Sequence, residues 1–278
     1  MADISKINGV AIANISKLKG RTLANGDKIF GISKPSSGGT AQTFLTKVSD
    51  WGSGLGAHPA GWETLANTHI VYGSQAVTRQ WSADSGGKTP SSGTGPTDGH
   101  DSTQGISGDG REGSSSDYMF TEASGYSNRH FLLRTPELDF SSALANNTLK
   151  LYFWFHIHGS HINTSAALGV AATDSSTSAA DTTLGKHFTA TNAGGLTIVY
   201  WDDNSDDGSS TASGVRIAGE QQTEGHGDTT VDAHWRLASV DLNDLAGQSS
   251  VYIWFYSKTG TSFRSDVAID DVEVVGEV

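Results

Sequence analysis

The sequence contains no cysteine among its 278 residues. This absence excludes disulfides, zinc–thiolate centres and thiol nucleophiles. Extracellular domains of this size usually carry disulfides. We therefore expect the chain to fold in a reducing cytoplasm, whether or not it acts outside a cell.

Cationic residues are also scarce, with 18 Lys and Arg against 30 Asp and Glu, for a formal net charge of −12. A phosphate-binding surface needs clustered cations, so nucleic acid is not an expected partner. No apolar run approaches the ~18 residues of a membrane span. The N-terminal residues lack the basic start and apolar core of a secretory signal. We expect neither a membrane span nor signal-dependent export.

Proline is rare, with 5 residues against 34 glycines, and 36% of the chain is hydrophobic. Glycine-rich and serine-rich stretches separate short apolar runs, which favours many short strands over packed helices. From Trp62 onward these runs follow one another at the spacing of a β-sandwich. We expect strands at residues 68–72, 118–122, 149–158, 167–171, 196–200, 235–240, 251–256 and 266–275. The sequence therefore predicts an all-β protein.

Residues 1–34 differ from the rest because they contain a short repeat. The unit Ile4-Ser5-Lys6-Ile7-Asn8-Gly9 recurs as Ile15-Ser16-Lys17-Leu18-Lys19-Gly20, and Ile32-Ser33-Lys34 echoes it. Such units are too small to bury a core of their own. Either this segment is a flexible tail, or it is an arm that docks apolar residues on a neighbouring subunit. The docking residues would be Ile4, Ile7, Val10, Ile12, Ile15 and Leu18.

Residues 35–60 begin with Pro35-Ser36-Ser37-Gly38-Gly39 and are predicted to be a linker. A second long loop, rich in Gly, Ser, Thr and Asp, lies between Ser82 and Ser116. Loops of this length in compact domains are usually functional or held by a ligand such as a metal ion.

Several segments after residue 60 follow, in order, the motifs of one known family. They are Gly61-Trp62-Glu63, Arg79-Gln80-Trp81, the loop from Thr89 through Gly93-Thr94-Gly95-Pro96 to Asp101, Tyr118-Met119-Phe120-Thr121-Glu122-Ala123-Ser124, Leu132-Leu133-Arg134-Thr135-Pro136, Phe153-Trp154-Phe155-His156-Ile157-His158-Gly159 and Asp266-Val267-Ala268-Ile269-Asp270-Asp271-Val272. Together they resemble the MAM domain. The resemblance implies an antiparallel jelly-roll β-sandwich over residues 61–278, with a role in adhesion and assembly. The family's usual disulfide cysteines are absent, so packing must replace them.

The resemblance also implies a calcium site, because some MAM domains bind this ion through an early glutamate, the Gly-Pro loop and the terminal Asp-Asp pair. The corresponding residues are Glu63, Asp98 or Asp101, and Asp270. The loop is one residue longer than the family pattern, so Asp98 and Asp101 both remain candidates. Calcium takes six to eight oxygen ligands, which such acids supply. The alternative is that these acids only cap turns.

Two further groups of residues have alternative interpretations. His156, His158 and His161 are either transition-metal ligands or hydrogen-bonded structural residues, and we favour the structural role. Trp51 and Trp81 are candidates for exposed contact residues, whereas Trp154, Trp201 and Trp254 lie in apolar runs and are predicted to be core.

The N-terminal stretch resembles those of structural proteins in tailed bacteriophages. With the MAM-like domain it implies a non-catalytic virion structural protein, either a head decoration, a fibre or a tail accessory subunit, made in the host cytoplasm. Its partners would be other virion subunits, a host-surface protein or glycan, and further copies of itself in a homo-oligomer. The alternatives are a bacterial adhesion or glycan-binding protein and a polysaccharide-degrading enzyme. No nucleophile elbow, phosphate loop or paired-carboxylate motif favours the enzyme.

Overall fold

The computed structural model describes residues 39–65, 70–71, 75–76, 79–85, 89–103, 110–113, 117–163, 167–173, 189–192, 198–202, 212–217, 219–222 and 235–278, together with six short strands before residue 34. The chain divides into two compact units, residues 1–40 and 41–278. In the described part the only helix is the 3-10 turn η5 (Asn243–Leu245), so no helix there is long and apolar enough to cross a membrane.

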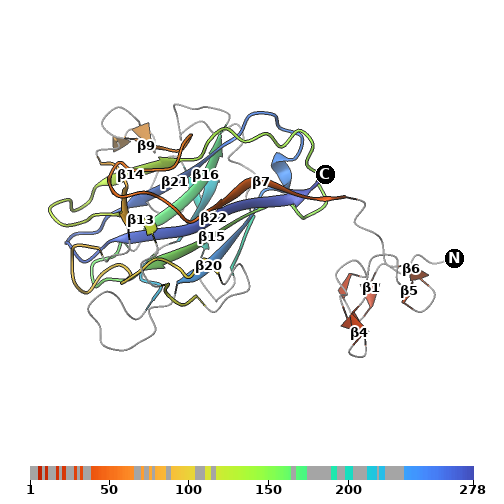
Figure 1. Ribbon diagram of the computed structural model, residues 1–278, viewed down its shortest axis with the longest axis horizontal. Coiled ribbons are helices and arrows are strands. Elements are labelled where there is room, and N and C mark those ends of the chain that lie inside the picture. Colours follow the sequence, from red (N-terminus) through yellow and green to blue (C-terminus); the bar gives the residue numbers. More distant parts are fainter. Residues whose placement is uncertain are drawn as a thin grey trace. The chain divides into compact units, whose positions relative to one another are not determined.

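Two antiparallel sheets form the second unit (Figure 1). One sheet has the order β17 (Thr189–Asn192), β20 (Arg236–Asp241), β15 (Lys150–Ile157), β22 (Val267–Glu277), β13 (Asp117–Thr121), β12 (Ser82–Ser85) and β8 (Gly54–Leu55), and β7 (Ala41–Val48) also pairs with β22. The other has the order β18 (Ile198–Asp202), β19 (Ala212–Ile217), β16 (Leu168–Thr173), β21 (Tyr252–Lys258), β14 (His130–Arg134) and β9 (Glu63–Leu65). A separate pair joins β10 (Ile70–Val71) to β11 (Gln75–Ala76). The predicted all-β, antiparallel jelly-roll sandwich is confirmed.

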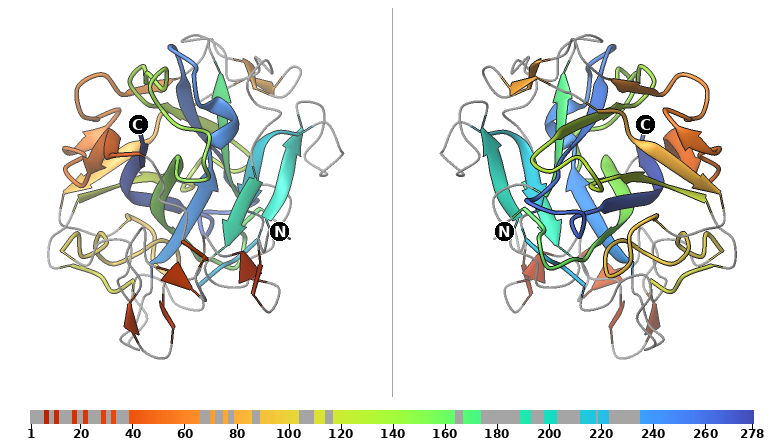
Figure 2. Two further views of the ribbon diagram at one scale, coloured as in Figure 1. Left: turned by 90° about the vertical axis from the view of Figure 1, so that its right-hand side faces the viewer. Right: turned by 90° about the vertical axis from the view of Figure 1, so that its left-hand side faces the viewer.

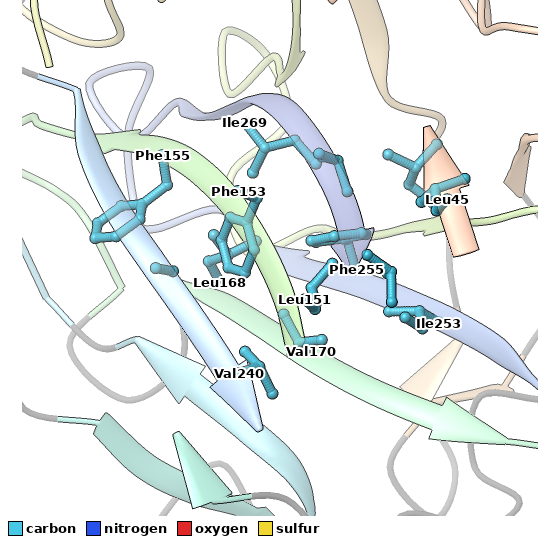
Figure 3. Close-up of a cluster of buried hydrophobic side chains, with 14 of the residues drawn as sticks. Leu45, Leu151, Phe153, Phe155, Leu168, Val170, Val240, Ile253, Phe255 and Ile269 are labelled. Carbon is cyan, nitrogen blue, oxygen red and sulfur yellow. The ribbon is translucent and has the colours of Figure 1, made fainter. Parts of the chain in front are cut away.

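The main core lies between the two sheets. Phe153 of β15 meets Phe255 of β21 edge to face, with ring centroids 5.2 Å apart. Figure 3 shows buried apolar side chains of both sheets together in this core. Among them are Ile269 of β22 in one sheet and Leu168 of β16 in the other. In Figure 2 the cyan strands β18 and β19 lie at one side of the six-stranded sheet, in which β18 is the outermost strand. Alternate residues of the central strands face this core, as expected for strands in a sandwich.

Strand β7 corrects the expected domain boundary. Residues 41–48 were predicted to be part of a linker, but they pair with β22 from Ala41↔Glu277 to Val48↔Val272. Leu45 of this strand is buried in the main core. The domain therefore begins at Ala41 rather than at residue 61, because β7 pairs with the last strand of the sandwich and contributes Leu45 to its core.

The first unit consists of three antiparallel hairpins. They pair β1 (Lys6–Ile7) with β2 (Val10–Ala11), β3 (Lys17–Leu18) with β4 (Arg21–Thr22), and β5 (Lys28–Ile29) with β6 (Ile32–Ser33). Their first residues, Lys6, Lys17 and Lys28, are eleven residues apart, and in each unit a glycine stands three positions after the lysine. The third repeat therefore begins at Lys28, whereas the sequence analysis placed its echo at Ile32-Ser33-Lys34.

Candidate functional site

A bulge in β22 places two acidic residues side by side on the outer face of the eight-stranded sheet. Between the pairs Tyr152↔Glu273 and Trp154↔Asp270, β22 has one residue more than β15. Asp271 takes up the extra length with φ 47°, a left-handed conformation that aspartate tolerates better than most residues. Since Ile269 and Val272 both face the main core, Asp270 and Asp271 are left on the opposite face.

The carboxylate of Asp270 is buried and surrounded by N–H donors. Its Oδ1 accepts hydrogen bonds from the Trp51 indole at 3.0 Å and from the Asp271 backbone at 2.7 Å. Its Oδ2 accepts one from the His100 backbone N–H at 2.9 Å. Burial, and then the charge of Asp271, raise the pKa of Asp270 well above its usual value. This residue therefore ties the loop at His100 and the segment at Trp51 to the last strand.

Asp271 binds cationic or polar groups from two other segments. Its Oδ2 lies 2.9 Å from Nδ1 of His100, whose ring stacks on Trp154 with centroids 4.0 Å apart. The Lys47 ammonium lies 3.8 Å from the same oxygen and donates a hydrogen bond to the Ser102 carbonyl oxygen. Lys47 of strand β7 thus places a positive charge next to the Asp271 carboxylate.

The long loop is held against the same face at further points. Thr94 Oγ1 accepts the Asp266 N–H at 2.9 Å and donates to the His158 carbonyl oxygen at 3.0 Å. Trp235 donates its indole N–H to the Asp98 carbonyl oxygen at 3.0 Å and its backbone N–H to the Gly110 carbonyl oxygen at 2.8 Å. The described parts of the loop, residues 89–103 and 110–113, are therefore held by polar groups that directly follow β15 or directly precede β20 and β22.

Glu112 joins the two arms of this loop. Its Oε1 accepts the Thr97 N–H at 2.7 Å, and a β-bridge pairs Glu112 with His100. Burial raises the pKa of Glu112 to about 7, against the opposing effect of the backbone N–H groups of Thr97 and Asp98. A group that titrates near neutrality therefore lies at the base of the loop.

The four acids predicted to bind calcium have separate partners. Glu63 stands on β9 of the other sheet and forms an ion pair with Arg134 at 2.7 Å. Asp101 accepts the Thr103 hydroxyl and pairs with Arg111 at 3.0 Å, interactions that lower its pKa to about 2. Asp98 lies in the loop, and Asp270 accepts the three N–H donors described above. No three acidic or histidine side chains among the described residues form a metal-ligand group, so one ion shared by these four residues does not fit this arrangement.

Three hydrogen-bond or ion-pair partners of Asp270 and Asp271 were missed by the sequence analysis. Lys47 lay in the expected linker, and His100 carries no motif of its own. Trp51 was predicted to be exposed but is fully buried, as is Trp81, because both belong to the main core. The adjacent acids Asp270 and Asp271, in a largely apolar strand, were the one available signal of a buried polar site.

The remaining predicted residues are placed as follows. His156 is buried against Trp235, and His158 lies 2.7 Å from Glu220, consistent with the structural role favoured for these histidines. Of the proposed docking residues, Ile7, Val10 and Leu18 lie in β1, β2 and β3. Ile4, Ile12 and Ile15 lie outside the described residues, and docking of the arm stays a prediction.

Comparison with known proteins gives only distant structural similarity. No family model and no curated protein matches the sequence. Among solved structures, the K3 cleaved adhesin domain of Lys-gingipain from Porphyromonas gingivalis w83 has 17% identity over 85% of this chain and 99% of that chain, with a TM-score of 0.37. The K2 adhesin domain of Lys-gingipain has 14% identity over 84% and 97%, with a TM-score of 0.35. A cyclase from Fischerella sp. TAU has 12% identity over 85% and 97%, with a TM-score of 0.41.

Proposed function

We propose that this protein is a non-catalytic adhesion and assembly module, a virion structural subunit that docks through residues 1–40 and presents its MAM-like sandwich outward. This proposal rests on the division of the chain into two compact units that differ in whether they contain a complete core. The larger unit has a complete core between two sheets, whereas the smaller consists of hairpins with two residues in each strand. A hairpin of that size is not stable alone in water. The smaller unit is therefore suited to ordering on a partner.

The regular repeat of the arm supports docking on a repetitive partner. Lys6, Lys17 and Lys28 each begin a hairpin of the same register, so the arm offers the same short strand pair three times. Repeated units that cannot bury their own apolar residues gain stability by packing against neighbours. Virion subunits, and further copies of this chain, are the partners that we propose.

The outer face of the sandwich supports a structural rather than a catalytic role. Its buried groups Asp270, Asp271 and His100 bind one another and the loop. A catalytic acid or base must be able to reach a substrate atom. These groups are fully or almost fully buried, and their hydrogen bonds hold the loop in place. The loop surface is then available to contact a host-surface protein or glycan.

Immunogold labelling of purified particles from a host that expresses this gene tests the proposal. An antibody against residues 41–278 should label intact particles, whereas an antibody against residues 1–40 should label only disrupted ones. Absence of the protein from particles, or equal labelling by the arm antibody before disruption, would contradict it. Capsid or tail genes beside this gene would support the same conclusion independently.

A further inference from the structure

Two carboxyl groups face each other where β13 ends and β22 begins. The antiparallel register pairs Thr121 with Val267, so the next opposed pair is Glu122 and Asp266. Directly opposed residues of antiparallel strands hold their Cβ atoms about 5 Å apart, and like charges at such positions repel each other. Two acids at this position therefore need a positive group or a proton between them.

Each carboxyl has one oxygen bound by the turn and one oxygen that accepts no hydrogen bond from the described part of the chain. Glu122 Oε1 accepts the Ser124 N–H at 2.6 Å, and Asp266 Oδ1 accepts the Ala123 N–H at 2.8 Å. Glu122 Oε2 and Asp266 Oδ2 are buried, and neither has a hydrogen-bond partner among the residues that the structure describes. Asp266 itself is fully buried. A buried carboxylate oxygen without a partner is costly, which indicates that a ligand belongs there.

The electrostatic environment of Asp266 includes two hydroxyl groups, those of Thr89 and Tyr118. The Thr89 hydroxyl lies beside Asp266, where it lowers the pKa of that acid, and it also lies 3.1 Å from the Thr94 carbonyl oxygen. Tyr118 is fully buried, and within the described ranges its hydroxyl has no hydrogen-bond partner. It precedes Glu122 by four positions, so the two side chains extend from the same face of the strand. None of the ion pairs between described residues includes Glu122 or Asp266.

We propose that Glu122 and Asp266 bind a hard divalent cation, with calcium as the ion of best fit. All the available ligand atoms are oxygens, and calcium accepts carboxylate, hydroxyl and carbonyl oxygens in flexible geometry. The ion would satisfy both unpartnered carboxylate oxygens and remove the repulsion between the opposed acids. It would also fix the Thr89 end of the long loop to the turn after β13. This site is distinct from the set of Glu63, Asp98, Asp101 and Asp270.

Calorimetric titration and thermal melting of the full chain, with calcium chloride against chelator, test this site. We expect calcium to bind and to raise the melting temperature by about 5 °C, because an ion held only by the folded state stabilises it. Glu122→Gln should abolish both the binding heat and this rise. In chelator the same variant should melt no lower than the wild type, since it loses the repulsion between the two acids. Asp266→Asn should behave in the same way.

Matched control variants distinguish this site from the calcium ligands that the sequence predicted. Glu63→Gln and Asp101→Asn should bind calcium as the wild type does. Loss of binding in these controls, with binding retained in Glu122→Gln, would overturn the proposal. An absence of any calcium response in the wild type would also overturn it, and would leave a shared proton as the group between Glu122 and Asp266.

Discussion

The indole N–H of Trp51 donates a hydrogen bond to Oδ1 of Asp270 at 3.0 Å, across 219 positions of the chain. This contact joins the segment after the first strand of the sandwich to its last strand. Both partners are fully or almost fully buried, so water cannot replace either of them. The two ends of the larger unit therefore stabilise each other through a polar contact within the protein.

Replacement of Trp51 by Phe should lower the free energy of unfolding by about 1–3 kcal/mol, because it removes a donor from a buried acid. The ring that remains still packs in the core. Trp62→Phe is the matched control, since Trp62 packs edge to face on Trp51 at 4.9 Å and lies in the same core. Urea denaturation should show the larger loss for Trp51→Phe. Equal losses would mean that the hydrogen bond contributes nothing beyond ring packing.

Stability should fall as the pH rises from 6 to 8.5 in the presence of chelator. Burial, followed by the charge of Glu122, raises the pKa of Asp266 from 3.8 to about 8. The folded protein thus holds a proton that the unfolded chain has released above about pH 4. The stabilisation from that proton is complete below pH 4 and is lost towards pH 8, at about 1.4 kcal/mol per pH unit. Glu112, with a pKa of about 7, contributes in the same direction.

Asp266→Asn should flatten this pH dependence, because the amide stays neutral at every pH. Asp101→Asn is the control. The pKa of Asp101 is lowered to about 2, so its contribution is lost only as the pH falls below 3.8 towards 2. Thermal melting between pH 6 and 8.5 should give the wild-type slope for Asp101→Asn. The same slope in Asp266→Asn would show that Asp266 does not hold the proton.

Substitution of Gly110 should weaken the attachment of the long loop. Its φ is +80°, and a Cβ there would lie 2.0 Å from the Trp235 carbonyl oxygen. Gly125 has a similar φ of +76°, but no atom of the described residues lies within 4 Å of its Cβ position. Gly125→Ala should therefore cost only the backbone strain of about 1–2 kcal/mol. Gly110→Ala should cost clearly more and should make the loop more sensitive to limited proteolysis. Identical losses in the two variants would contradict the close approach at Gly110.

The apolar strands were predictable from the sequence, and the attachments between distant segments were not. β15 and β22 are long, mostly apolar runs with side chains buried on both faces, so their positions followed from composition. In β7 only Leu45 is buried. A strand in which apolar and polar residues alternate so little has the sequence pattern of a loop. Its partner lies at the other end of the chain, and register between such strands depends on tertiary packing.

The polar face was predictable only in part for a similar reason. The pair Asp270-Asp271 indicated a buried polar site, but its partners Trp51, Lys47 and His100 come from two other segments. No local pattern identifies them, because each has ordinary neighbours in the sequence. The third hairpin of the arm was missed since its Phe30-Gly31 replaces the Asn-Gly and Lys-Gly of the first two.

Deletion of residues 1–40 tests the proposed separation of assembly from folding most directly. The truncated chain should melt within a few degrees of the full chain, because the core of the sandwich lies within residues 41–278. It should also be lost from purified particles, whereas the full chain is recovered in them. Full recovery of the truncated chain in particles would contradict the docking role of the arm, and unfolding of the truncated chain would show that residues 1–40 belong to the core of the domain.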